Sequence, residues 1–169
     1  VREFLGDFET PITLAAKLRA HGKFFLLESM EGGEKWGRYS ILGLDIRREF
    51  LIEDGQAIVR HVNVETRLPG NPVAAFQQFL ASFSAVQPPG LPRFFGGAVG
   101  YFSFEAVRHF ERCGRVPPNR TGFPEAYFML ADHLAVFDNV NHTIKLVCCV
   151  HPREFASLHA AYEHGQATL

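Results

Sequence analysis

The dipeptide Asp54-Gly55 constrains the fold more than any other feature of this sequence. It joins two segments that are predicted to be strands, 45–53 and 57–64. Asp-Gly between such segments is a strong signal for a two-residue hairpin turn, and strands joined by so short a turn pair antiparallel. The sequence therefore predicts an antiparallel sheet and not a parallel array with crossover helices.

Further strands and helices are predicted on both sides of this hairpin. Thr10 is a suitable N-cap and Pro11 fits the first position of a helix. The predicted helices cover 12–20, 73–83 and 105–111, with a last one opening at Pro152, and the other predicted strands cover 24–28, 38–44, 127–138 and 143–150. This order predicts an α+β fold, in which antiparallel sheets pack with a few helices.

Composition excludes several classes of protein. The chain has 169 residues, 47% hydrophobic residues and a net charge of −1, which indicates a globular domain without a basic nucleic-acid surface. Its apolar segments are too short to span a bilayer, so a soluble, cytoplasmic protein is predicted. Cys148 and Cys149 are neighbours on a predicted strand and point to opposite faces, so both are expected to be free, buried thiols.

The common catalytic motifs are not present. The segment 96–100 (Gly-Gly-Ala-Val-Gly) lacks the Gly-Lys-Ser/Thr ending of a phosphate loop, so we expect its glycines to allow close backbone approach within a sheet. The eight histidines are dispersed and form no metal-ligand spacing, so no metal site and no catalytic residue are predicted. Asp132 and Asp138 are interpreted as solvated residues of one strand.

The most informative polar residues lie between 24 and 43. An apolar segment ends abruptly at Glu28 and Ser29, and Arg38 opens the next apolar segment. A carboxylate, a hydroxyl and a guanidinium close to one hairpin could hold a small zwitterion, because the acid accepts bonds from an ammonium and arginine binds a carboxylate. The alternative is that Glu28 pairs with Arg38 and that Ser29 caps the turn.

The segments 26–29 (Leu-Leu-Glu-Ser) and 37–40 (Gly-Arg-Tyr-Ser) resemble component I of anthranilate synthase, a chorismate-utilising enzyme of tryptophan biosynthesis. The resemblance continues through 96–105 and 108–111 and covers nearly the whole chain in the right order. It extends only to the N-terminal part of that family, so residues 1–169 are expected to form its regulatory domain. The chorismate-binding domain, with its Mg²⁺, would lie beyond this chain.

The resemblance implies a regulatory role. In the family, chorismate and ammonia from a glutamine amidotransferase, component II, give anthranilate and pyruvate, and tryptophan is the feedback inhibitor. This chain would carry no catalytic residue and no cofactor, and would be inactive alone. The residues expected to contact tryptophan are Leu27, Glu28, Ser29, Arg38, Tyr39 and Ser40.

Three alternatives remain open at this point. The chain could be the N-terminal part of aminodeoxychorismate synthase component I, an enzyme of the folate pathway. It could be a stand-alone amino-acid-binding module, or a scaffold in which Glu28 and Arg38 only pair with each other. The continuous match over 28–40 favours the tryptophan enzyme.

Overall fold

The computed structural model describes residues 1–28, 37–112, 114 and 118–169, and the chain divides into two compact units. The first unit consists of Val1–Ile46, Gln87–Gly97 and Ala131–Leu169, and the second of Arg47–Val86 and Ala98–Leu130. Each unit contains an antiparallel sheet with a helix against it, so the predicted α+β fold is confirmed.

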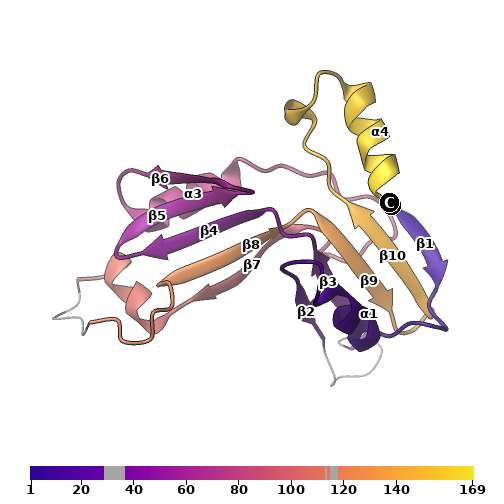
Figure 1. Cartoon of the computed structure of the whole chain (residues 1–169), viewed down its shortest axis with the longest axis horizontal. Coiled ribbons are helices and arrows are strands. Elements are labelled where there is room, and N and C mark those ends of the chain that lie inside the picture. The colour runs from indigo at the N-terminus through magenta and orange to yellow at the C-terminus, as the bar shows by residue number, and fades with distance from the viewer. Residues whose placement is uncertain (29–36, 113, 115–117) are drawn as a thin grey trace. The chain divides into compact units, whose positions relative to one another are not determined.

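The sheet of the first unit has the strand order β1-β10-β9-β3-β2. Its strands are β1 (Arg2–Leu5), β2 (Phe25–Leu27), β3 (Tyr39–Leu44), β9 (His133–Asp138) and β10 (Thr143–Cys148). Helix α1 (Pro11–Leu18) lies against one face, where Leu14 and Leu18 pack on the buried side chains of Leu42 and Phe137 (Figure 1). Burial of this apolar face holds the unit together.

N-cap residues set the first residues of the two α-helices described in the first unit. Thr10 accepts a hydrogen bond from the backbone N–H of Thr13 at 3.1 Å, as predicted for the start of α1. At the other end of the chain, Pro152 opens only the short 3₁₀ helix η2 (Pro152–Glu154). The last helix, α4 (Leu158–Thr168), starts later than predicted because Ser157 supplies its N-cap.

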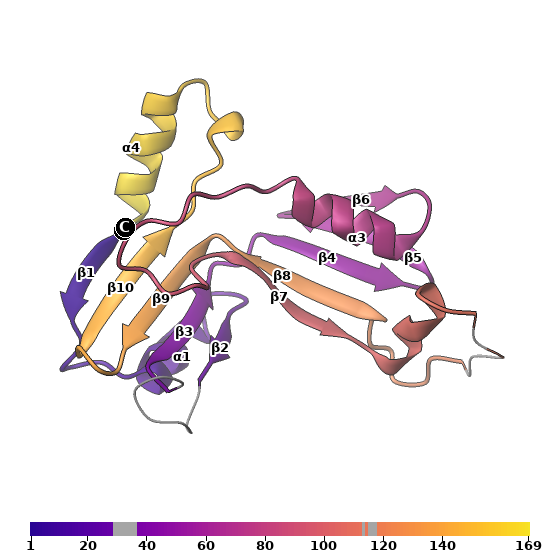
Figure 2. The same cartoon turned by 180° about the vertical axis from the view of Figure 1, so that it is seen from behind.

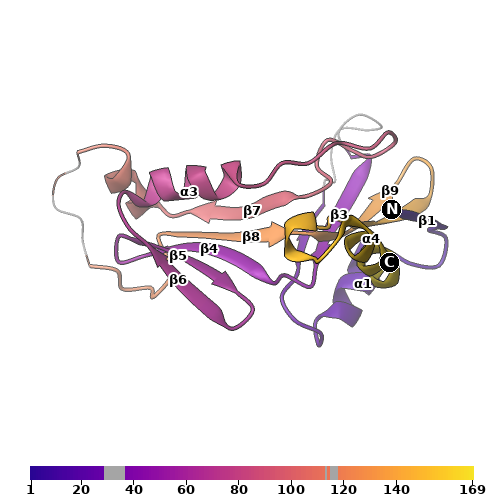
Figure 3. The ribbon, with the colours of Figure 1, turned by 90° about the horizontal axis from the view of Figure 1, so that it is seen from above.

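The second sheet has the order β6-β5-β4-β8-β7, with α3 (Pro72–Ala81) on one face (Figures 2 and 3). Its strands are β4 (Arg48–Glu53), β5 (Gln56–His61), β6 (Val64–Leu68), β7 (Gly97–Phe102) and β8 (Ala126–Ala131). The ring of Phe76, from α3, lies 5.0 Å from Phe50 and 4.3 Å from Phe128. Phenylalanines of α3, β4 and β8 therefore build much of this core. The predicted Asp54-Gly55 turn joins β4 to β5, and both of its residues have positive φ.

Two sequence predictions are wrong around Asp132. The single predicted strand over 127–138 is two strands, β8 and β9, which belong to different sheets. The change of sheet occurs at Asp132, whose carbonyl accepts a hydrogen bond from the Cys149 N–H at 2.7 Å. Asp138 is not solvated either, since only 2% of it is exposed.

Strands β1 and β6 were not predicted, because both are largely exposed and carry charged residues.

Within the described ranges, no helix combines the length and the apolar composition needed to cross a membrane.

Gly100 allows β7 to approach β8 closely. Such a close backbone approach was predicted from the sequence for the glycines of segment 96–100. A methyl group at Gly100 would lie 1.9 Å from the carbonyl oxygen of Tyr127, a backbone atom that cannot move without displacing the strand. We therefore expect Gly100→Ala to lower the free energy of unfolding by about 1–3 kcal/mol, as overpacked sites do. Gly114→Ala is the matched control, because a methyl group there would meet no atom within 4 Å. Equal urea midpoints for the two variants would contradict this account of the strand contact.

Candidate functional site

The residues predicted to contact tryptophan lie at the end of β2 and at the beginning of β3. Leu27 ends β2, pairs with Ile41 of β3 and is 42% exposed. Glu28 follows it at the exposed end of the strand. Ser29 lies outside the described residues. Leu27 and Glu28 thus place an apolar surface and a carboxylate side by side at an edge strand of the first sheet.

Arg38 has a carboxylate partner within the sheet itself. Its Nε lies 3.1 Å from Oδ1 of Asp138, and its Nη2 lies 2.7 Å from Oδ2 of the same residue. The carboxylate partner of Arg38 is therefore Asp138, and among the described residues no contact between Glu28 and Arg38 accompanies it. A guanidinium has five N–H groups. This bidentate contact uses the single N–H on Nε and one of the two on Nη2. The Arg38 side chain is 37% exposed.

Asp138 gathers further donors from the turn between β9 and β10. Its Oδ1 accepts hydrogen bonds from the backbone N–H of Val140 at 3.1 Å and of Asn141 at 3.2 Å, and Oδ2 accepts one from the Asn141 side chain at 3.0 Å. Burial opposes ionisation, but the bonds from Arg38 and from these amides outweigh it and lower the pKa of Asp138 below its ordinary value. The carboxylate therefore stays charged and fixes the start of β3.

Asn139 fixes the same stretch through the backbone. Its N–H donates to the carbonyl of Arg38 at 2.8 Å, and its side-chain amide donates to the carbonyl of Gly37 at 3.1 Å. The same amide lies 3.4 Å from the hydroxyl of Ser40. The β9–β10 turn thus holds the segment from Gly37 to Ser40 by side-chain and backbone contacts together.

Tyr39 and Ser40 lie on opposite faces of β3, since successive side chains of a strand alternate. Ser40 is 1% exposed and shares the face of Leu42, against which α1 packs. Tyr39 shares the face of Ile41 and Leu27, and its ring lies 5.0 Å from the guanidinium carbon of Arg38. The structure therefore brings Leu27 and Tyr39 to one face, while Ser40 lies in the core beneath α1.

A second buried carboxylate, Glu125, was not found from the sequence. It accepts hydrogen bonds from Nε of Arg108 at 2.9 Å, from the Gly55 N–H at 2.9 Å and from Nε2 of His109. Burial opposes ionisation here as well, but the bonds from His109, Arg108 and Gly55 keep the pKa of Glu125 lowered. Glu125 therefore joins the β4–β5 turn to the 3₁₀ helix η1 (Phe104–His109), which is a structural role.

The two described cysteines, Cys148 and Cys149, lack the features of a catalytic nucleophile. Cys148 and Cys149 are both free and half-buried, as expected for neighbours on opposite faces. Burial raises the pKa of Cys148, and it raises the pKa of Cys149 to about 11, whereas a reactive thiol needs a lowered value. His151 lies 2.8 Å from Asp132, but no activated cysteine accompanies that pair among the described residues.

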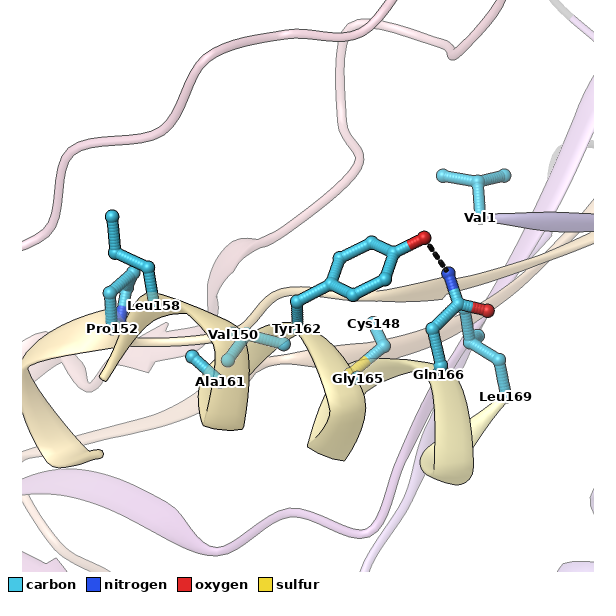
Figure 4. Close-up of a pocket in the computed structure, with 10 residues that line it drawn as sticks. All are labelled: Val1, Cys148, Val150, Pro152, Leu158, Ala161, Tyr162, Gly165, Gln166 and Leu169. Atoms are coloured by element: carbon cyan, nitrogen blue, oxygen red, sulfur yellow. Dashed lines mark hydrogen bonds between the residues drawn. The ribbon is translucent and has the colours of Figure 1, made fainter. Parts of the chain in front are cut away.

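A pocket of about 300 Å³ lies beside α4 (Figure 4). Mainly apolar side chains line it, and the only dashed contact in the view joins the hydroxyl of Tyr162 to the amide of Gln166 at 3.1 Å. Its ten lining residues include none of the predicted tryptophan contacts. The pocket is therefore a mainly hydrophobic recess, and none of its ten lining residues has a charged side chain that could orient a zwitterion.

Neither a metal nor a nucleotide site is formed by the described part of the chain. No three His, Cys, Asp or Glu side chains come together there as metal ligands. Residues 97–100 of the glycine segment lie within strand β7 itself, whereas a dinucleotide loop follows a strand and opens a helix.

Comparisons with known proteins show which family this chain belongs to. Residues 22–167 match the family described as chorismate binding enzyme. The chain is 40% identical over 153 residues to anthranilate synthase component 1 of Acetivibrio thermocellus, and 41% identical over 171 residues to that of Pseudomonas aeruginosa. These alignments cover 88% and 99% of this chain but only 30% and 34% of the relatives, so the chain spans about a third of their length.

A solved structure shares the fold. The crystal structure of anthranilate synthase component I from Streptococcus pneumoniae superposes with a TM-score of 0.61 and 22% sequence identity, over 99% of this chain and 36% of that one. The chain therefore belongs to the chorismate-binding enzyme family. Its relatives at about 40% identity are component 1 of anthranilate synthase, so the resemblance seen in the sequence is confirmed.

The Asp138 carboxylate makes stability depend on pH. Because its pKa is lowered by folding, its contribution is present above the unfolded value and is lost as pH falls through the folded value. We expect Asp138→Asn to lower the free energy of unfolding at neutral pH by about 1.5 kcal/mol, the lower end for bonds to a charged group, since water screens the partly exposed Arg38.

Urea unfolding between neutral pH and about pH 3 checks this expectation, because an ordinary Asp titrates near 3.9. The difference between wild type and Asp138→Asn is expected to narrow as the pH falls below about 3.9, because the carboxyl of the unfolded chain is protonated there before that of the folded chain. Glu163→Gln, at an exposed position on α4, is the control and should leave the profile unchanged. A difference that stays constant with pH would contradict an ionised Asp138.

Proposed function

We propose that this chain is the N-terminal, tryptophan-sensing part of a longer anthranilate synthase component I. The whole polypeptide would convert chorismate and glutamine-derived ammonia to anthranilate and pyruvate, as a lyase of tryptophan biosynthesis in the cytoplasm. One observation carries the proposal: relatives with that name match 99% of this chain at 41% identity. The chain's share of their length, 34%, supports its being one part of the polypeptide.

The geometry at β2 and β3 suits tryptophan in three ways. Leu27 and Tyr39 share one face, where they offer apolar and aromatic surface to an indole ring. Glu28 is exposed at the end of β2, where its carboxylate can accept hydrogen bonds from an ammonium group. The two N–H groups on Nη1 of Arg38 are not used by Asp138, so Arg38 can hold its structural partner and still donate to a carboxylate.

Ser40 has a supporting role in the proposed site and does not contact the ligand. Its side chain is 1% exposed beneath α1, so it would act by keeping β3 in place and not by reaching a ligand from the Tyr39 face. Ser29 stays a predicted direct contact. The site is thus formed by exposed residues on the edge strand β2 and supported by buried ones on β3.

Control of the enzyme requires two global states with different affinities for tryptophan. The second wall of the inhibitor pocket, the chorismate site and its Mg²⁺ would all be supplied by the polypeptide beyond this chain. The glutamine amidotransferase, component II, would supply ammonia to that same part. This chain by itself would therefore be inactive and would contribute only the sensing surface.

The first test uses the longer polypeptide with Glu28→Ala. We expect its chorismate-dependent activity to be unchanged, while the tryptophan concentration for half-inhibition rises at least about tenfold, the factor that corresponds to 1.4 kcal/mol of lost binding. Ser29→Ala should behave in the same way. Glu163→Ala is a matched control, since it also removes an exposed carboxylate from the first unit. Unchanged inhibition in both test variants would sink the assignment of this site.

The second test uses the 169-residue chain alone. With only one wall of the pocket, its dissociation constant for tryptophan should be about 1 mM or higher. About 1 mM tryptophan would then add no more than about 0.4 kcal/mol of stability, a shift in melting temperature near 1 °C. A scanning-fluorimetry shift of several degrees, absent with phenylalanine, would show instead that this chain holds a complete site.

A further inference from the structure

The turn between β4 and β5, Asp54-Gly55, is chemically the most labile dipeptide of the sequence. It is the single Asp-Gly in the chain, and no Asn-Gly occurs. Because glycine has no side chain, its backbone nitrogen can approach the side chain of the residue before it. Asp54 is exposed, so water is available at the turn. This dipeptide is therefore the place where the sequence most favours spontaneous isomerisation of an aspartate.

The isomerisation needs no reagent other than water. The backbone nitrogen of Gly55 loses its proton and forms a bond to Cγ of the Asp54 carboxyl, and that proton and a carboxyl oxygen leave in a molecule of water. The product is a five-membered succinimide ring. Water then adds to the former main-chain carbonyl carbon, and the bond between this carbon and the nitrogen breaks. The chain now runs through Cβ and Cγ as isoaspartate, the water is regained, and nothing is oxidised or reduced.

In the folded protein the N–H of Gly55 is directed away from this reaction. It donates a hydrogen bond to Oε1 of Glu125 at 2.9 Å. Because the peptide group is planar, the new bond to Cγ has to form in the direction that the hydrogen occupies. Glu125 lies in that direction, so attack on Asp54 requires that this hydrogen bond break and that the peptide group turn.

The Glu125 carboxylate cannot easily move out of the way. The residue is 5% exposed, and its own backbone N–H donates to the carbonyl of Ile52 in β4 at 2.8 Å. Arg108 donates to both carboxylate oxygens and His109 contacts Oε2. Both residues belong to η1, which lies at the same end of the second sheet as the turn (Figures 1 and 2). The acceptor of the Gly55 N–H is thus fixed from two elements.

We propose that Asp54-Gly55 is a latent isoaspartate site, which the Glu125 carboxylate keeps closed in the folded protein. A hydrogen bond to a charged group is strong enough to slow a reaction that must first break it by at least about tenfold. The product would add one main-chain carbon to a two-residue turn and so disturb the pairing of Glu53 with Gln56. All the residues involved belong to the second unit, and the inference does not depend on the proposed function.

Incubation of the longer polypeptide at neutral pH, below its unfolding temperature, tests this inference. Isoaspartate at position 54 is quantified by electron-transfer fragmentation, which distinguishes it from aspartate of the same mass. A synthetic peptide that covers residues 50–59 gives the rate without the surrounding protein. We expect the wild type to isomerise at least about tenfold more slowly than the peptide, and Glu125→Ala at least about tenfold faster than the wild type.

Two further variants separate the Glu125 contact from general stability. Glu125→Asp keeps a carboxylate on the same backbone but is one methylene shorter, so it should lose the Gly55 N–H and isomerise as fast as Glu125→Ala. It also serves where Glu125→Ala does not fold. Gly100→Ala is the control, because it destabilises the same unit without contact to Gly55 and should isomerise at the wild-type rate. Urea midpoints verify that each variant is folded during incubation.

Three results would overturn the inference. A folded Glu125 variant that isomerises at the wild-type rate would show that the turn itself is sufficient for protection. A wild type as fast as the peptide would show that the site is not closed. Equal acceleration in Gly100→Ala and the Glu125 variants would show that the reaction proceeds through unfolding of the whole unit. None of these readouts involves anthranilate formation or tryptophan, so failure of the proposed function is scored separately.

Discussion

Two buried carboxylates, Asp138 in the first unit and Glu125 in the second, accept hydrogen bonds from distant parts of the sequence. Asp138 binds Arg38, 100 residues away, together with the amides of its own turn. Glu125 binds Gly55, 70 residues away, and Arg108. A buried charge is costly unless several donors satisfy it, so removal of any one donor is felt by the whole cluster. These two clusters fix the loops that the apolar cores leave unspecified.

The Asp138 cluster also changes how the proposed tryptophan site is understood. Arg38 was expected to serve a ligand, but its first task is to secure the start of β3, and Asn139 holds the neighbouring backbone. The site is therefore supported from the β9–β10 turn, which is remote in sequence and adjacent in space. The proposed binding surface lies on a short edge strand and needs such support, because β2 has only three residues and pairs only with β3 among the described strands.

The sequence was sufficient for the local features and insufficient for the distant pairings. The Asp54-Gly55 turn, the Thr10 cap and the close approach at Gly100 all follow from rules that act within a few residues, and each was predicted. The roles of Asp138 and Glu125 could not be predicted, because nothing near either residue identifies its partner. For the same reason the continuous apolar segment over 127–138 concealed a change from one sheet to the other at Asp132.

Because both units are discontinuous in sequence, their sheets can form only in a certain order during synthesis. All of the second unit lies between Arg47 and Leu130, so its sheet can form while the ribosome is still producing the rest. The first unit must wait, since β3 pairs with β9 and β1 pairs with β10, near the other end of this chain. During that interval β2 can pair with β3, but β1 lacks β10 and β3 lacks β9. Contacts between segments so far apart form slowly because of the entropy of loop closure. The nascent first sheet is therefore the stage at which a chaperone would be most useful to this protein.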